Sequence, residues 1–594
     1  YELRFRKPPA GDALVVLRFS GRIDFPVEQA AGEYARSFSE TPGIISAEGA
    51  YLAGSTVWVP KFGYELITFE MTVSLPGGWD AVSQGNRTAR ELRGGRRIAR
   101  WESPEPMEEI FLIAAPFHEY SAKAGTVDVM AFLRTPDEAL AGKYLETTSQ
   151  YLDMYRGLIG PYPFTKFALV ENFWETGYGM PSFTLLGEKV IRFPFILHSS
   201  YPHELLHNWW GNSVYVDFGG GNWCEGLTTY MADHLIKEQR AQGAQYRRDA
   251  LQRYADYVGP ESDFPLRSFI SRTDAATEAV GYGKSMMVWH MLRRTIGDGP
   301  FIEGVRSFYR DNIYRAASFE DLRTAFERSS GIDLGGFFRQ WVERTGAPEL
   351  RLSNVSARSV AGGYELGLTL SQVQEGEPYS LRVDAAISFR DSVAVRAISM
   401  DCAAKEFRFD FREIPISVTI DPEFDLFRRL DPDEIPPSLS GAFGAGRVAV
   451  VLPSAAGDPM MEGYRAIADA WAGDSTLSVL IVTDDAIEAL PAGMPAWILG
   501  RGNRFRNLIE EGLRGYDASI DTESLRFGGT TLAYEGNIAV VSVRHPGDPG
   551  SVLVWLALGD PGAVPGLLAK LHHYGKYGHL VFEGAEPVNI VKGQ

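Results

Sequence analysis

The sequence predicts a multidomain α+β protein, and three observations lead to this class. First, 594 residues exceed what one hydrophobic core accommodates, so several domains are expected. Second, segments that alternate apolar and polar residues, as strands do, give way near residue 134 to helical periodicity and return near residue 347. Third, apolar strands and amphipathic helices alternate after residue 433, which is typical of an α/β domain.

Residues 1–133 are expected to form an all-β domain. Gly, Pro and Asn turn signals separate its alternating segments, and each segment is predicted to be a strand. The four segments are ALVVLRFSGRI (13–23), STVWVP (55–60), ELITFEMTVSLP (65–76) and VDVMAFLR (127–134).

Residues 134–346 are expected to form a mostly helical domain. Thr135 is the predicted N-cap of its first helix, in which apolar residues from Leu140 to Leu152 recur near helical spacing. Further helical segments follow to about Trp341, most of them closed by Gly or Asn.

Two more domains complete the predicted organisation. Alternation in residues 347–432 indicates a small β sandwich. DPDEIPP (431–437) is predicted to be a linker to the α/β domain of residues 433–594. Within it, GAFGAG (441–446) precedes a strand instead of joining a strand to a helix, so it lacks the context of a dinucleotide-binding loop.

Composition and charge exclude several classes of partner. With Lys+Arg 58 against Asp+Glu 76, the net charge of -18 repels nucleic acid and anionic lipid. The longest apolar runs are too short to span a membrane, and two cysteines far apart exclude a disulfide framework. Because the numbering begins at Tyr1 and not at a methionine, we expect a removed leader. This favours a periplasmic, envelope or extracellular location, with the cytoplasm as the alternative.

The segment YPHELLHNWWGN places two histidines four positions apart, with a glutamate directly after the first. On a helix, positions i and i+4 lie one above the other, so His203 and His207 can direct both imidazoles at one point. Ser200 and Pro202 are expected in the first turn as cap and early proline, and the helix is expected to end near Gly211.

Glu225 is the expected third ligand. It precedes the periodic stretch LTTYMADHLI and should project from the first turn of a second helix. Two histidines and one carboxylate, with water in the fourth position, form the arrangement of catalytic zinc, so one Zn²⁺ ion is predicted. Glu204 lies about 100° around the helix from His203, where it can act as general base without binding the metal. The alternative is a pair of hydrogen-bonded core histidines, and it leaves Glu204 and Glu225 unexplained.

These residues, with Tyr282-Gly283-Lys284-Ser285, resemble the aminopeptidase N and leukotriene hydrolase family of zinc metallopeptidases, the gluzincins. The resemblance extends to residues 58–85 and 337–350, and so to most of the chain up to about residue 430. It implies a β saddle, a thermolysin-like catalytic domain and a β sandwich, and it leaves the C-terminal α/β domain outside the family pattern. It also implies that His203, His207 and Glu225 bind zinc, that Glu204 is the general base and that Tyr282 stabilises the oxyanion. The resemblance further implies a peptide substrate.

Aminopeptidases of this family carry the segment Gly-Ala-Met-Glu-Asn upstream of the zinc-binding helix, and its glutamate pairs with the α-ammonium group of the substrate. The chain departs from this pattern. Here Gly179 and Met180 match as substrate-binding positions, but Pro181 stands in place of the glutamate. Glu171 and Glu175, just upstream, are candidate substitutes. Cys224 occupies the usual asparagine position beside Glu225 and is an alternative metal ligand.

Three alternatives to an aminopeptidase stay open. The proline at position 181 favours an endopeptidase or a peptidase of altered specificity. A non-catalytic scaffold that keeps zinc structurally is a second alternative, and a hydrolase of non-peptide substrates is a third.

Overall fold

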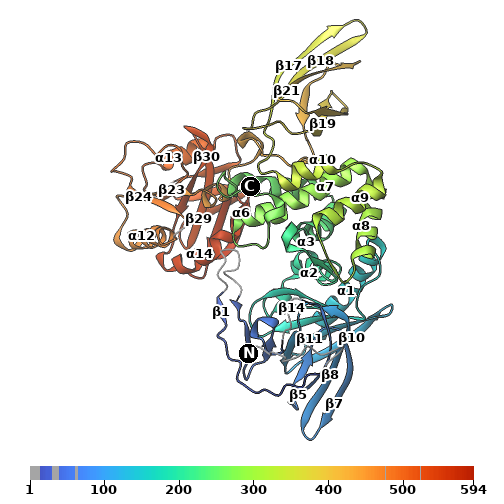
Figure 1. Cartoon of the computed structure of the whole chain (residues 1–594). Helices are drawn as coiled ribbons and strands as arrows, with labels where there is room; N and C mark the ends of the chain where they lie inside the picture. The colour runs from blue at the N-terminus through green and yellow to red at the C-terminus, as the bar shows by residue number, and fades with distance from the viewer. Residues whose placement is uncertain (1–13, 30–38, 61–64, 475–476, 522) are drawn as a thin grey trace, which may run out of the picture.

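The computed structural model describes residues 14–29, 39–60, 65–474, 477–521 and 523–594. As expected, the chain combines sheets and helices in several regions, which follow the chain order in Figure 1 from the N-terminal strands through a helical centre to the sandwich and the C-terminal sheet. Within the described ranges, no helix is both long and apolar enough to cross a membrane.

The N-terminal region consists of small antiparallel sheets. In the three-stranded sheet, β8 (Arg96–Met107) pairs with β5 (Ile67–Pro76) and β7 (Asn86–Arg93). The other strands are β1 (Glu28–Gln29) with β2 (Ser39–Glu40), and the four-stranded sheet β3 (Gly43–Ile45), β4 (Ala50–Leu52), β9 (Leu112–Ala115) and β6 (Asp80–Val82). Exposed and less exposed residues alternate along β5 as its sequence predicts.

Two predicted strands of this region are wrong. Residues 14–23 of the first segment contain no strand, and its Ala13 lies outside the described residues. In the second, residues 54–56 form a 3₁₀ turn and Val57 adopts a left-handed conformation. Alternation only shows that side chains can be divided between two faces, whereas a strand also needs a hydrogen-bonding neighbour along its length. In the first segment the carbonyl of its last residue, Ile23, accepts a hydrogen bond from the Ile45 amide, and in the second the amides of Thr56 and Val57 bond within their own turn.

A five-stranded sheet lies between the N-terminal strands and the helices, in the order β10-β11-β12-β14-β13. The strands are β10 (His118–Ala124), β11 (Val127–Leu133), β12 (Lys166–Asn172), β14 (Phe183–Gly187) and β13 (Gly177–Met180). Helix α1 (Glu138–Leu158) connects β11 to its parallel neighbour β12, so the sheet contains strands from both sides of residue 133. Asp137, not Thr135, caps α1, because its side chain accepts a hydrogen bond from the Leu140 amide.

The helical region surrounds the candidate site. Its α-helices are α2 (Ser200–Leu206), α3 (Cys224–Thr229), α4 (Leu235–Gln239), α5 (Gly243–Tyr257), α6 (Ala275–Glu278), α7 (Ser285–Ile296), α8 (Asp298–Asn312), α9 (Phe319–Ser330) and α10 (Gly335–Phe338). Three π-helical segments, η6 (Tyr230–His234), η8 (Ala279–Lys284) and η9 (Arg339–Glu343), interrupt or extend them. Fully buried tryptophans fill the core, among them Trp209, Trp210, Trp223 and Trp289.

Two three-stranded antiparallel sheets form the sandwich region. They are β17 (Leu350–Val360), β18 (Gly363–Gln372) and β21 (Ala404–Phe411), and β20 (Val393–Met400), β19 (Leu381–Ser388) and β22 (Ser417–Ile420).

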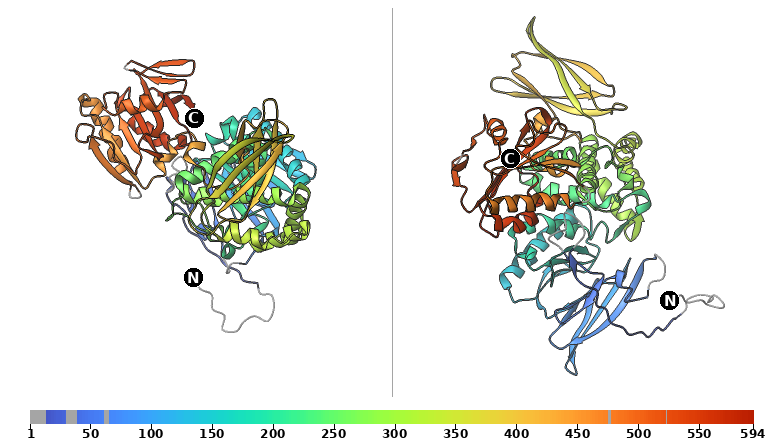
Figure 2. Two further views of the ribbon diagram at one scale, coloured as in Figure 1. Left: turned by 90° about the horizontal axis from the view of Figure 1, so that it is seen from above. Right: turned by 90° about the vertical axis from the view of Figure 1, so that its left-hand side faces the viewer.

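The C-terminal region (residues 438–594) is a seven-stranded mixed sheet with helices on it. Its order is β24 (Ser478–Thr483), β23 (Arg447–Leu452), β25 (Ala496–Leu499), β30 (Asp548–Ala557), β29 (Asn537–His545), β31 (His579–Glu583) and β32 (Val588–Gly593). The first four strands are parallel, and the remaining neighbours are antiparallel. The helices are α11 (Ser440–Phe443), α12 (Asp458–Ala472), α13 (Arg506–Gly512) and α14 (Val564–Leu571). Both views of Figure 2 place this region beside the helical region.

Candidate metal centre and active site

Helix α2 presents the two histidines to one side. The His207 amide donates to the His203 carbonyl, 3.2 Å away, so the residues lie one helical turn apart, and their rings are 4.9 Å apart. The helix begins at Ser200 but ends at Leu206, before the predicted end near Gly211. The chain turns there because the side chains of Trp209 and Trp210 are drawn into the core, where both are fully buried.

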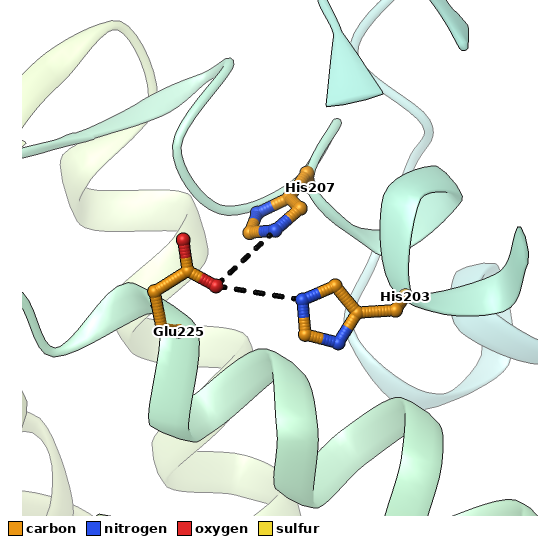
Figure 3. A group of neighbouring side chains, drawn as sticks. All are labelled: His203, His207 and Glu225. Carbon is orange, nitrogen blue, oxygen red and sulfur yellow. Dashed lines mark ion pairs between the residues drawn. The ribbon is translucent and has the colours of Figure 1, made fainter. Parts of the chain in front are cut away.

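Glu225 lies in the first turn of α3 and faces both imidazoles (Figure 3). Its Oε2 is 3.4 Å from Nε2 of His203 and 3.6 Å from Nε2 of His207. Burial would raise the pKa of the Glu225 carboxyl, but the two imidazoles lower it to about 2. The carboxylate is therefore charged and available as a ligand at neutral pH.

These three side chains fit zinc. A tetrahedral site with bonds of about 2.0–2.1 Å has edges of about 3.3–3.4 Å between donor atoms, close to both measured separations. Two neutral nitrogens and one carboxylate oxygen are also the donors that catalytic zinc sites use. Within the described ranges, no other group of three His, Cys, Asp or Glu side chains brings its donor atoms within 4.8 Å of one another.

Asp233 holds the first histidine in place. Its Oδ2 is 2.7 Å from Nδ1 of His203, on the opposite side of the ring from Glu225. Burial lowers the pKa of His203, but the charge and hydrogen bond of Asp233 raise it well above the ordinary value. A carboxylate at Nδ1 orients the ring and increases the basicity of Nε2. Sequence reasoning missed Asp233, although an acidic residue on the helix that carries Glu225 was a usable signal.

Cys224, the alternative ligand, lies behind the site. Its Sγ is 3.6 Å from Nδ1 of His207, the nitrogen that does not face Glu225. Burial raises the pKa of the Cys224 thiol well above its ordinary value, so the side chain stays protonated in the absence of metal. The geometry favours Glu225.

Glu204 lies against the edge strand β13. A Cβ atom added to Gly179 would come within 2.5 Å of Oε2 of Glu204, so only glycine leaves room for this carboxylate. Gly179 and Glu204 both line the cavity that holds the metal-ligand candidates. Met180, the next residue along the strand, is instead buried in the core.

Tyr282 projects from the π-helical segment η8. Its ring is nearly parallel to that of His203, at 6.4 Å between centroids. Burial and the neighbouring Glu225 carboxylate raise the pKa of the phenol far above its ordinary value, so the phenol keeps its proton. Tyr282 lies inside a continuous helical run, because α6, η8 and α7 follow one another from Ala275 to Ile296. π-Helical turns are frequent at functional sites.

The cavity has a volume of about 1150 Å³ and is lined by several regions of the chain. Glu171 and Glu175 are not among its lining residues. Glu171 is 1% exposed and pairs with Arg192 at 2.6 Å, and Glu175 accepts a hydrogen bond from the Lys189 amide. Neither predicted substitute for the amine anchor is placed to meet a substrate in the cavity, because backbone and ion-pair partners hold both away from it.

Sequence reasoning also missed parts of the cavity wall. Glu108, in the loop after β8, lines it from the N-terminal region, and residues 572–576 line it from the C-terminal region. No local pattern marks these residues, since their position depends on how distant regions pack.

Comparison with known proteins identifies the segment that carries the metal-ligand candidates. Residues 198–341 match the model of the peptidase family M1 domain. Aminopeptidase N of Streptomyces lividans is 23% identical over 392 residues, which cover 59% of this chain and 43% of that protein. The mitochondrial aminopeptidase 2 of Saccharomyces cerevisiae is 29% identical over 158 residues, or 25% of this chain and 17% of that protein. The chain thus spans less than half the length of these curated relatives.

A solved structure with a similar fold is Legionella pneumophila aminopeptidase A in complex with aspartic acid. It aligns with a TM-score of 0.53 at 19% identity and covers 68% of this chain and 49% of that chain. At this identity the likeness concerns the fold alone. The matched domain contains the three metal-ligand candidates, Glu204 and Tyr282, so residues 198–341 carry the site within a segment that matches the peptidase M1 domain, in a chain that is similar to aminopeptidase N.

Proposed function

We propose that this protein is a zinc-dependent peptidase that hydrolyses peptide bonds with an activated water, in the manner of an aminopeptidase. The observation that carries the proposal is the approach of Glu225 Oε2 to within 3.4 and 3.6 Å of the two histidine Nε2 atoms. Zinc bound there would polarise the scissile carbonyl and lower the pKa of water to about 7.

Two groups of the chain would then act on the substrate, and a third would hold a metal ligand in place. Glu204 takes a proton from the attacking water and passes it on to the leaving amine. The protonated Tyr282 phenol donates a hydrogen bond to the oxygen on which negative charge develops, and Asp233 keeps His203 oriented during turnover. Because the phenol hardly ionises, it serves as a donor across the neutral pH range.

Substitution of Glu204 tests this proposal. The E204Q variant should bind one equivalent of zinc, while kcat falls about 10²- to 10⁴-fold, since the amide cannot accept the proton. E146Q, which changes an exposed glutamate of α1, should behave as wild type. Chelation should abolish the wild-type activity, and added zinc should restore it. A non-catalytic scaffold would hydrolyse no peptide with or without zinc.

An endopeptidase is the second candidate, because Pro181 removes the usual amine anchor and neither Glu171 nor Glu175 lines the cavity. Burying an unpaired α-ammonium group would cost several kcal/mol, so an aminopeptidase needs another acid. Glu108 is the cavity acid contributed by the N-terminal region. Comparing a free peptide with its N-acetylated twin decides the mode: an aminopeptidase cleaves only the free form, and an endopeptidase cleaves both.

A further inference from the structure

A buried polar network lies behind Asp233, the residue that holds His203 at Nδ1. Its centre is His234, the next residue of η6, whose side chain is fully buried. Successive side chains of a helix point about a quarter of a turn apart, so Asp233 lines the cavity while His234 faces the core. The direction of the Asp233 carboxylate therefore depends on how His234 is held.

Arg247 of α5 binds the inner nitrogen of this histidine. Its Nη1 donates to Nε2 of His234 at 2.8 Å. A guanidinium group can only donate, so Nε2 must be the unprotonated nitrogen of a neutral imidazole. Burial, with the charges of His290 and Arg247, lowers the pKa of His234 to about 2, which keeps the ring in this neutral form.

The other donors of Arg247 bind the loop that follows the sandwich strand β22. Nε donates to the Phe424 carbonyl at 3.1 Å, and Nη2 donates to the Glu423 carbonyl at 2.9 Å. Nη2 also lies 3.0 Å from Oδ1 of Asp425. Because the donors of a guanidinium group form a rigid, planar fork, these contacts hold the loop and His234 in one fixed geometry.

A second histidine connects the same loop to α7. Nε2 of His290 lies 2.8 Å from Oδ1 of Asp425, and its ring centre is 5.3 Å from that of His234. Arg294, one turn further along α7, pairs with Asp425 at 3.2 Å and with Asp384 of β19 at 2.8 Å. The sandwich strands meet the helical region at this point (Figure 1). Polar contacts thus run continuously from the sandwich to η6.

We propose that His234 is a positioning residue, through which the sandwich region fixes Asp233 and with it the metal ligand His203. The inference rests on the proposed zinc-dependent function, and it extends the support of the metal centre to a separate region of the chain. A π-helical turn such as η6 is rare, so contacts around it are needed to maintain its direction. His234 does not line the cavity, so any effect that it has on the metal must pass through its neighbours.

Two substitutions separate the hydrogen bond of His234 from the packing of its side chain. In H234F a ring remains but offers no acceptor to Arg247, whereas H234Q places an acceptor oxygen near the position of Nε2. Among the described residues, Nδ1 of His234 has no hydrogen-bond partner, so glutamine loses no contact there. H234F should bind zinc about tenfold more weakly than wild type, and H234Q should stay within about twofold of it, in competition with a chromophoric chelator.

A double-mutant cycle tests whether the effect passes through Asp233. In the D233N background, H234F should add little to the loss of zinc affinity that D233N causes alone, because the charge that His234 positions has already been removed. Additive losses would place the action of His234 elsewhere and overturn the proposal.

L322A is the control for a general loss of stability, because Leu322 is fully buried in α9, which packs on α8 and β16. This variant should melt at a lower temperature than wild type and still bind zinc with wild-type affinity. Losses of affinity in L322A or in H234Q that equal the loss in H234F would overturn the positioning role. Since zinc affinity is measured without substrate, a wild type that binds zinc but cleaves no peptide would refute the proposed function alone. A wild type that binds no zinc would refute both.

Discussion

Asp233 Oδ2 lies 2.7 Å from Nδ1 of His203, so the carboxylate and the metal-facing Glu225 contact opposite nitrogens of one ring. The D233N variant keeps the shape of the side chain at position 233 but removes the negative charge that makes Nε2 of His203 a better electron-pair donor to zinc. We expect zinc affinity to fall about 10- to 100-fold, as measured by competition with a chromophoric chelator. D249N, a neutralised acid elsewhere in the cavity wall, should bind zinc like wild type. Unchanged affinity in D233N would show that Asp233 does not tune the ligand.

Tyr282 should act on the transition state and not on substrate binding. Replacing it by Phe removes the donor and keeps the ring, so kcat should fall about 10²- to 10³-fold with little change in KM. Zinc content should stay at the wild-type level. Steady-state kinetics on a peptide substrate measure both constants, with Y516F, at an exposed tyrosine of the C-terminal region, as control. A rise in KM at constant kcat would contradict the role as oxyanion donor.

Gly179 should be required for the position of the general base. In G179A the added methyl group would meet Glu204 Oε2, the end of a flexible side chain, so the carboxylate should move while the fold persists. A shift of about 1 Å at a catalytic group can cost about 10²-fold in rate. We therefore expect a large loss of kcat with unchanged melting temperature and zinc content.

G177A is the matched control for this substitution. Gly177 lies on the same strand and lines the same cavity, but a Cβ there would meet only Leu186, at 3.9 Å. Its activity should be close to wild type. Equal activity of G179A and wild type would exclude the contact as a constraint on catalysis.

Asp256, on the face of α5 that meets the C-terminal region, should make stability depend on pH. Burial raises its pKa to about 6, although Ser440, Arg544, Gln252 and Arg429 oppose the shift. Between the ordinary value of 3.8 and about 6, the folded protein keeps a proton that the unfolded chain releases. Stability should therefore decline as pH rises through this window, by about 1.4 kcal/mol per pH unit, and level off above it.

The D256N variant has no such proton. Between pH 4 and pH 7 the free energy of unfolding of D256N should therefore rise by about 2 to 3 kcal/mol relative to that of wild type. The reason is that only wild type loses the stability that the Asp256 proton supplies. Urea unfolding of both proteins at several pH values gives this difference. The contributions of all other titrating groups are the same in both proteins and cancel. A difference that does not vary with pH would show that Asp256 ionises as readily in the folded protein as in the unfolded chain.

Local sequence signals predicted the features that depend on neighbours along the chain. The four-residue spacing of His203 and His207 implied one helical face, and Glu225 was expected in the first turn of the next helix, where it lies. Local signals were less reliable where two nearby residues suit the same structural role. Thr135 and Asp137 both suit an N-cap, and the aspartate has the hydrogen bond to Leu140.

Features that depend on packing were missed or wrong. The π-helical segments that place Asp233 and Tyr282 have no composition that distinguishes them from ordinary helix. Glu171 and Glu175 were chosen for their proximity in sequence to Pro181. The folded chain instead engages the first with Arg192 and the second with backbone amides.

The sequence by itself determined the class of chemistry, because ligand spacing on a helix is set by a repeat of 3.6 residues and needs no knowledge of distant contacts. Only the tertiary structure decided which groups surround that chemistry. Residues 572–576 line the same cavity as Glu225, although about 350 residues of chain separate them. Their proximity depends on the burial of apolar surface between distant regions, and no local sequence pattern encodes that packing.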